Sequence, residues 1–204
     1  MQNIFMSKQK PEDYVEKDGV GEFPAAPRKC PFGDCGINLE MKKNGFYIRL
    51  LITITSTHLI RVRRYKCVMC GRTLSMLPSF CLAGQTYGVE IMVTLLQYTI
   101  NKGSIRKAVR EWHRIAVEVS RRLINKYLSR LRENRRLIQY GINQITPDKI
   151  SLGRMPGDTE WTKSFLSGIR PSLSPEFNAN FHKATGKSFM SFHNRISQPI
   201  VQIQ

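Results

Sequence analysis

Four of the five cysteines form two close pairs. Four residues separate Cys30 from Cys35, two separate Cys67 from Cys70, and 31 residues lie between the pairs. Two such pairs offer four thiolates to one tetrahedral metal ion, because each pair forms a tight turn with both sulfurs pointing inward. A glycine follows the second cysteine of each pair, which suits a turn that needs positive φ. The pattern predicts a structural Zn²⁺ site whose four sulfurs leave no open position for water.

Other chemistry for these thiols stays open at this point. Clustered cysteines can also be buried or redox-active thiols, form a disulfide or hold iron, and spacing alone does not separate these cases. The fifth cysteine, Cys81, comes shortly after Leu77-Pro78, and we expect it to be a small buried side chain. His58 falls at an expected hairpin tip, where a surface residue is a better interpretation than a ligand.

The segment between the cysteine pairs is rich in Ile, Leu, Val, Thr and Tyr, with a polar interruption at residues 56–58. This composition predicts two antiparallel strands, at about residues 46–55 and 58–66, joined by a short turn. Two cysteine turns linked through a β-hairpin make a zinc ribbon, here residues 29–80. Such a module is too small to fold on its core alone, so the metal would supply much of its stability.

The second of these strands carries four cations. Period-2 alternation places Arg61 and Arg63 on one face and Arg64 and Lys66 on the other. No acidic residue occurs within residues 41–89. The strand is therefore predicted to contact phosphates, with a solvated face as the alternative.

From about residue 87 the apolar period changes from 2 to 3.6. A first helix is predicted to end at Gly103, and Ser104 to cap a second helix. A tight turn at residues 113–116 leads into a third helix near Val117. This order predicts a helix-turn-helix domain over residues 86–140, whose third helix enters the major groove. Its inward side chains would be Val119, Leu123, Tyr127 and Leu131.

The outward face of the third helix carries side chains that suit base edges and phosphates. Arg can bind guanine with two hydrogen bonds, Asn can bind adenine, and Glu can accept from cytosine. The predicted base-reading residues are Glu118, Ser120, Arg121, Arg122 and Asn125. The predicted phosphate contacts are Lys126, Arg130 and Arg132. For each residue alone, a solvated helix face is the alternative.

The chain of 204 residues has 32 basic and 15 acidic residues, a net charge of +17. Residues 30–140 hold fourteen of these excess charges, which makes nucleic acid the leading partner. The longest apolar stretches are too short to span a membrane, and no signal peptide is recognisable, so we expect a cytoplasmic, nucleoid-associated protein with reduced thiols. Residues 1–28 are charge-balanced and predicted to be a mobile leader.

The last 64 residues, 141–204, are predicted to form an irregular, partly helical appendage. One helix is expected after Ser174, with Pro175 in its first turn and Gly186 as its stop. The third helix of the preceding domain is expected to continue to Gly141 with an intermittent apolar stripe. That stripe would pack either on the appendage or on a second copy in a homodimer, and both remain open.

The motifs CPFGDCG and RVRRYKCVMCGRTLSMLPSF, followed by a helix-turn-helix, resemble a known arrangement. They are similar to the N-terminal DNA-binding part of bacterial insertion-sequence transposases and of related small bacterial proteins with the same ribbon. The resemblance covers residues 28–135, about half of the chain, and residues 64–73 are its most specific stretch. It implies recognition of terminal inverted repeats, a ligand role for the four paired cysteines and a reading role for the third helix.

Those transposases continue into a catalytic domain of the RNase H type, in which three carboxylates hold two Mg²⁺ ions. Four carboxylates follow the helical segment here, namely Asp148, Asp158, Glu160 and Glu176. They lie within 64 residues without the strands needed to present them, so no enzymatic activity is expected.

The sequence therefore predicts an α+β protein with a zinc ribbon, a helix-turn-helix domain and a C-terminal appendage. Its expected function is recognition of double-stranded DNA, as a regulator or a transposase-derived module with structural Zn²⁺. One alternative is an RNA-binding or transcription-machinery adaptor, because zinc ribbons also dock proteins and RNA. Another is the DNA-recognition subunit of a separately encoded recombinase.

Overall fold

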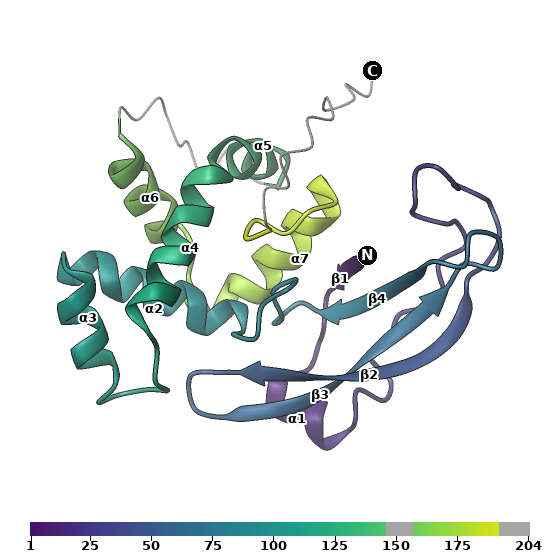
Figure 1. The fold of residues 1–204 in the computed structure, drawn as a ribbon, viewed down its shortest axis with the longest axis horizontal. Coiled ribbons are helices and arrows are strands. Elements are labelled where there is room, and N and C mark those ends of the chain that lie inside the picture. Colours follow the sequence, from purple (N-terminus) through teal and green to yellow (C-terminus); the bar gives the residue numbers. More distant parts are fainter. Residues whose placement is uncertain (146–156, 192–204) are drawn as a thin grey trace.

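The computed structural model describes residues 1–145 and 157–191 (Figure 1). Within this part, a four-stranded sheet lies beside a group of packed helices, which makes a mixed α+β fold. The strands are β1 (Gln2–Phe5), β2 (Lys42–Ile52), β3 (Thr57–Lys66) and β4 (Thr73–Pro78). The helices are α1 (Pro11–Glu16), α2 (Val89–Lys102), α3 (Ile105–Trp112), α4 (Arg121–Glu133), α5 (Arg135–Ile145), α6 (Asp158–Ser167), the 3-10 turn η1 (Pro171–Leu173) and α7 (Ser174–Thr185).

The sheet has the strand order β1-β4-β3-β2. Strands β2 and β3 form the expected antiparallel hairpin, with Leu50 opposite Leu59. Its first strand begins and ends earlier than predicted. The strand ends at Ile52 because the turn starts at Thr53, whose N–H donates to the Ser56 carbonyl at 2.9 Å. Strand β4 pairs antiparallel with β3, and β1 pairs parallel with β4. The hairpin thus belongs to a larger sheet than a ribbon alone would have.

The prediction of a mobile leader at residues 1–28 is wrong. Strand β1 pairs with β4, and α1 places Tyr14, which is completely buried, under the sheet. The Tyr14 hydroxyl donates to the carbonyl of Arg61 at 2.9 Å, and its ring packs edge-on against Phe80. A few apolar side chains such as Ile4 fix this segment, although its overall composition is polar.

The first two predicted helices of the helical segment are confirmed, but the turn into the third is longer than expected. Gly103 ends α2 in the left-handed region at φ 65°, and Ser104 caps α3. Helix α4 begins at Arg121, so residues 113–120 form the connection in place of a tight four-residue turn. The Nε2 atom of His113 lies 2.8 Å from the Val119 carbonyl oxygen and 3.3 Å from the Val119 nitrogen, and this contact holds the connection outside the helix.

The third helix also ends earlier than expected. Asn134 ends α4, and α5 follows as a separate helix. The Asn134 side chain is buried and donates to the carbonyls of Phe189 and Ser191, each at 2.9 Å. A contact to the distant C-terminal part of the chain therefore fixes this break.

The described part of the C-terminal region is not a separate appendage. Trp161 and Phe165 of α6 and Phe181 of α7 are buried in the same core as α2, α4 and α5. Helix α7 has the predicted Pro in its first turn and ends at Gly186 with φ 66°. The helical core therefore continues past residue 140, where the sequence indicated a boundary. Residues 146–156 and 192–204 of the predicted appendage lie outside the described residues.

Candidate metal centre and basic surface

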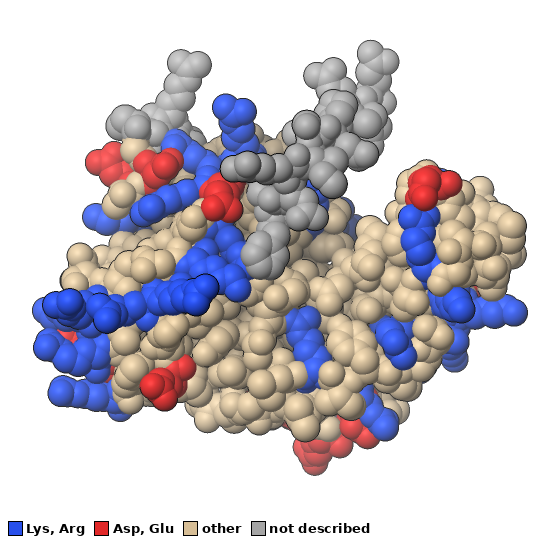
Figure 2. Space-filling view, viewed as in Figure 1, with Lys and Arg blue, Asp and Glu red and all other residues tan. Residues whose placement is uncertain are grey.

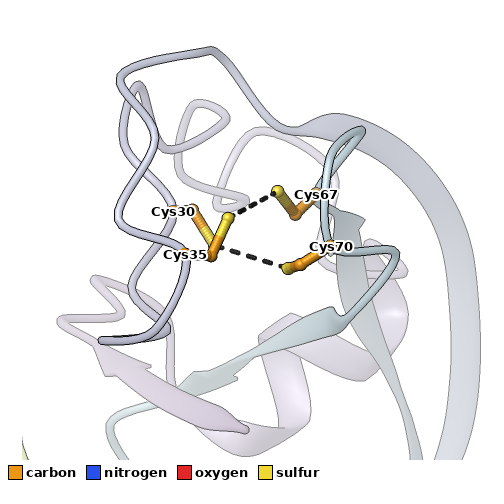
Figure 3. Close-up of side chains that lie close together, drawn as sticks. All are labelled: Cys30, Cys35, Cys67 and Cys70. Atoms are coloured by element: carbon orange, nitrogen blue, oxygen red, sulfur yellow. Dashed lines mark hydrogen bonds between the residues drawn. The ribbon is translucent and has the colours of Figure 1, made fainter.

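The four paired cysteines meet at one end of the sheet (Figure 3). Their sulfur atoms all lie within 4.8 Å of one another. The Sγ atoms of Cys30 and Cys70 are 3.8 Å apart, and so are those of Cys35 and Cys67. A tetrahedral ion with Zn–S bonds of about 2.3 Å needs sulfurs about 3.8 Å apart. The cluster can therefore bind a metal ion such as zinc.

Two similar turns present these sulfurs. Cys30 and Cys35 lie in the loop before β2, and Cys67 and Cys70 in the loop between β3 and β4. Gly36 and Gly71 have φ of 54° and 67°, so both predicted glycine positions are confirmed. Because each sharp reversal needs the left-handed region, any other residue would strain these turns. All five cysteines are free thiols, and Cys81 is completely buried outside the cluster, as expected.

Arg72 joins the two cysteine turns, a role that the sequence analysis missed. Its Nε donates to the Cys70 sulfur at 3.5 Å, and its guanidinium forms an ion pair with Asp34 of the other turn. The same guanidinium lies 4.3 Å from the ring centre of Phe32. The sequence signal for this role is a cation two residues after the last ligand. The signal is weak, because the sequence does not show the contact to Asp34.

The electrostatic environment differs between the two turns. The Arg72 hydrogen bond lowers the pKa of Cys70 to about 6, which favours the thiolate that a metal ion requires. Burial raises the pKa of Cys30 to about 12, so this side chain is stable as a thiolate only beside a positive charge. A bound divalent cation supplies such a charge.

The cations of β3 contact the protein itself. Arg61 is 3.3 Å from the Asp18 carboxylate, and Arg63 lies 3.9 Å from the ring centre of Phe46. Arg64 donates to the Phe46 carbonyl at 3.3 Å. The fourth residue of the predicted phosphate-binding set, Lys66, is exposed. Most of this set is thus already engaged within the chain.

Of the predicted DNA-reading residues, Arg130 is buried, Ser120 is exposed but caps a helix, and the others form an exposed group without such a role. Arg130 is only 2% exposed, because it lies on the side of α4 that faces the core, so the structure contradicts a phosphate contact at this position. Ser120 is the N-cap of α4, and its hydroxyl accepts from the Leu123 N–H at 3.1 Å. The exposed group consists of Glu118, Arg121, Arg122, Asn125, Lys126 and Arg132.

Helix α3 adds cations that the sequence analysis did not assign. Those of α3 are Arg106, Lys107 and Arg110, all exposed, and Arg114 in the connection after α3 is exposed as well. Figure 2 shows Lys and Arg side chains as a band that crosses from α3 to α4. We call the exposed cations of α3, α4 and the connection between them the basic surface. No ion pair within the described residues includes Arg106, Arg110, Arg121 or Arg122.

Comparisons with protein-family models, curated proteins and solved structures found no match. The similarity to insertion-sequence transposases thus stays a prediction from the residues. None of the helices in residues 1–145 and 157–191 is long and apolar enough to cross a membrane.

Proposed function

We propose that this protein binds double-stranded DNA through the basic surface. The observation that carries the proposal is the exposed set of arginines on α3 and α4, which form no ion pair with the described residues, in a chain with a net charge of +17. Such a band attracts the phosphate backbone and gains affinity by releasing counterions. Its position on two adjacent helices suits a contact that follows one groove and the phosphates beside it.

Within this surface, we assign base contacts to the start of α4. Arg121, Arg122 and Asn125 are exposed there and can each make hydrogen bonds to base edges. The cations of α3 together with Lys126 and Arg132 would bind phosphates and set the orientation of α4. The connection at residues 113–120 is longer than in a tight helix-turn-helix. The spacing between α3 and α4, and therefore the way in which they would dock on DNA, would differ from that motif.

The metal in this proposal is Zn²⁺ with a structural role. The residues that would hold it are the four paired cysteines, whose closed sulfur shell leaves no position for a substrate. When bound, the ion would neutralise thiolates and hold the two cysteine turns together. Arg72 would support the shell by donating to one ligand sulfur and pairing with the opposite turn.

We infer recognition rather than catalysis. Of the carboxylates that could serve a three-carboxylate site, Asp158 is paired with Arg135 at 3.0 Å, and Asp148 lies outside the described residues. A partner such as a separately encoded recombinase would supply catalysis in a transposition role, whereas a regulator would act alone. Both roles require the same DNA contact, and a homodimer would double it.

Binding at graded salt concentrations tests the proposal. Zinc-loaded protein is titrated into fluorescent random duplex DNA and into structured RNA of equal charge, and anisotropy gives the affinity. If about 6 phosphates are contacted, log K falls with log salt at a slope of roughly −5. Tighter binding to RNA would support the adaptor alternative instead. Affinity that does not change with salt would overturn a nucleic-acid function altogether.

A selection from randomised duplexes then tests sequence preference. A palindromic site indicates a dimer, a single site indicates a monomer, and the absence of a motif would contradict base reading by α4.

A further inference from the structure

A hollow of about 480 Å³ lies where the sheet meets the helices. The segment before α1, the hairpin turn, the start of α2 and the 3-10 turn before α7 all contribute to its lining. Its volume lies within the range of about 300–1,000 Å³ that is typical of small-molecule sites. Because these segments are far apart in the sequence, no local motif could have indicated the hollow. It is separate from both the cysteine cluster and the basic surface.

The inner part of the hollow is apolar. Leu51, Phe80 and Ile91 line it, and each is at most 5% exposed. These side chains come from β2, the loop after β4, and α2, so both the sheet and the helices form this part. A hydrocarbon or aromatic group placed there would leave water for an apolar environment, which is favourable.

The charged part of the lining is acidic on balance. Among its charged residues, Glu12 and Glu90 bring two carboxylates and Lys10 brings one ammonium group. Burial raises the pKa of Glu90, and the nearby charge of Glu12 raises it further, while Lys10 opposes this shift. Gln9 also lines the hollow, and its Oε1 is buried without a hydrogen-bond partner in the described part of the chain.

Within the described residues, the titratable side chain of His58 also lies beside Glu12. Its Nε2 lies 3.7 Å from the Glu12 carboxylate and 2.7 Å from the Ser56 hydroxyl. The His58 ring therefore contacts Glu12 from the hairpin side, while Glu90 faces the hollow from α2.

We propose that this hollow binds a small organic cation, a primary amine attached to an apolar body. The ammonium group would lie between Glu12 and Glu90 and donate to the Gln9 side chain, and the apolar body would contact Leu51, Phe80 and Ile91. The two carboxylates exceed the single cation of the lining, so an amine would balance the charge, and the unpartnered Gln9 Oε1 would accept one of its hydrogen bonds. A carboxylate of the same shape would meet like charges.

Three probes of matched shape test this proposal on the full-length, zinc-loaded protein. They are 2-phenylethylamine, 2-phenylethanol and phenylacetate, which are positive, neutral and negative at pH 7. In ¹H–¹⁵N spectra, the amine should shift the amides of Leu51, Phe80 and Ile91 in a saturable way. The alcohol should bind at least tenfold more weakly, and phenylacetate should cause no saturable shift.

Matched variants locate the charge requirement. Glu90→Gln and Glu12→Gln should each weaken binding of the amine about tenfold, whereas Glu16→Gln, at an exposed position of α1 outside the lining, should not change it. Unchanged metal content and unfolding temperature show that a variant is folded. Equal binding of amine and alcohol, binding that ignores both glutamates, or no binding of the amine would each overturn the proposal.

Discussion

The sheet region, residues 1–80, and the helical region, residues 89–145 and 157–191, are held together in different ways. The helical region has one large core that contains Trp112, Trp161 and Phe165. The sheet region has two smaller clusters, one around Tyr14 and one that includes the cysteines. Because its clusters are smaller, additional bonds would contribute strongly to the stability of the sheet region, and a metal ion held by four sulfurs can supply them.

The two regions also differ in what their cations do. On β3, Arg61 and Arg63 contact the ring of Phe46, and Arg61 also pairs with Asp18. On α4, Arg121 and Arg122 extend to solvent. The arginines of β3 thus stabilise the sheet region, whereas those of α4 are accessible to a partner. Equal numbers of cations in a sequence therefore do not imply equal binding surfaces.

Loss of the metal site should have the largest effect and should be confined to the sheet region. Cys70→Ser removes one ligand, and zinc binding contributes about 10–16 kcal/mol in small zinc-dependent peptides, so we expect several kcal/mol of destabilisation. Hydrogen exchange should show lost protection at residues 30–41 and 67–74, with α2, α5 and α7 still protected. Cys81→Ala is the control, because it should leave the metal content unchanged. Uniform loss of protection in both regions would contradict the comparison.

Removal of arginines in pairs should separate binding from stability. Arg121→Ala with Arg122→Ala should lower DNA affinity about 100-fold, since each base contact contributes about 1–3 kcal/mol, without a change in unfolding temperature. Arg61→Ala with Arg63→Ala should lower the unfolding temperature and change DNA affinity by less than about threefold, because these side chains contact the protein. Anisotropy and calorimetry measure the two quantities. Similar losses of affinity in both variants would remove the distinction between the surfaces.

A methyl group at Gly141 should test the packing of the helical core. An added Cβ would lie 2.2 Å from Cε2 of Phe181, so Gly141→Ala should destabilise by about 1–3 kcal/mol. This exceeds the gain of about 1 kcal/mol that alanine normally gives in a helix. The same change at Gly33 in the sheet region meets nothing within 4 Å and should have little effect. Urea denaturation of both variants measures the difference, and a stabilised Gly141→Ala protein would show that α5 and α7 pack less closely.

The smallest effect concerns Ser120, which the sequence placed among the base-reading residues. Because its hydroxyl caps α4, Ser120→Ala should cost about 1 kcal/mol of stability. Ser104→Ala, at the cap of α3, should cost a similar amount. Ser120→Asp keeps an acceptor at the cap and should retain wild-type stability in urea denaturation, while its charge weakens DNA binding. Full stability of Ser120→Ala would instead favour a role in binding alone.

Local signals in the sequence predicted the elements whose ends are set by neighbouring residues. The cysteine turns need glycine after the second cysteine, and the boundary between α2 and α3 follows from Gly103 and Ser104. Both features involve hydrogen bonds or dihedral angles within a few residues. The clustering of the four cysteine sulfurs was predicted for the same reason, because each short turn limits the positions of its two sulfur atoms.

Elements fixed by distant contacts were missed. Strands β1 and β4 and helix α6 were not predicted, because contacts such as the pairing of Gln2 with Ser75 have no signal in the neighbouring sequence. Arg130 is buried because it lies three residues after Tyr127 and directly before Leu131, on the face of α4 that packs into the core. The role of Asn134 could not be predicted either, because its partners are Phe189 and Ser191.

The parallel pairing of β1 with β4 has a consequence for how the chain folds during synthesis. Gln2 of β1 lies opposite Ser75 of β4, so the first strand leaves the ribosome long before its partner. Both cysteine turns emerge in the interval, and a metal ion captured there would fix the residues just before β4. Closing the long loop between the two strands would then cost less entropy, because the ion would already have shortened the free chain. Metal supply during translation would thus set the time at which β1 pairs with β4.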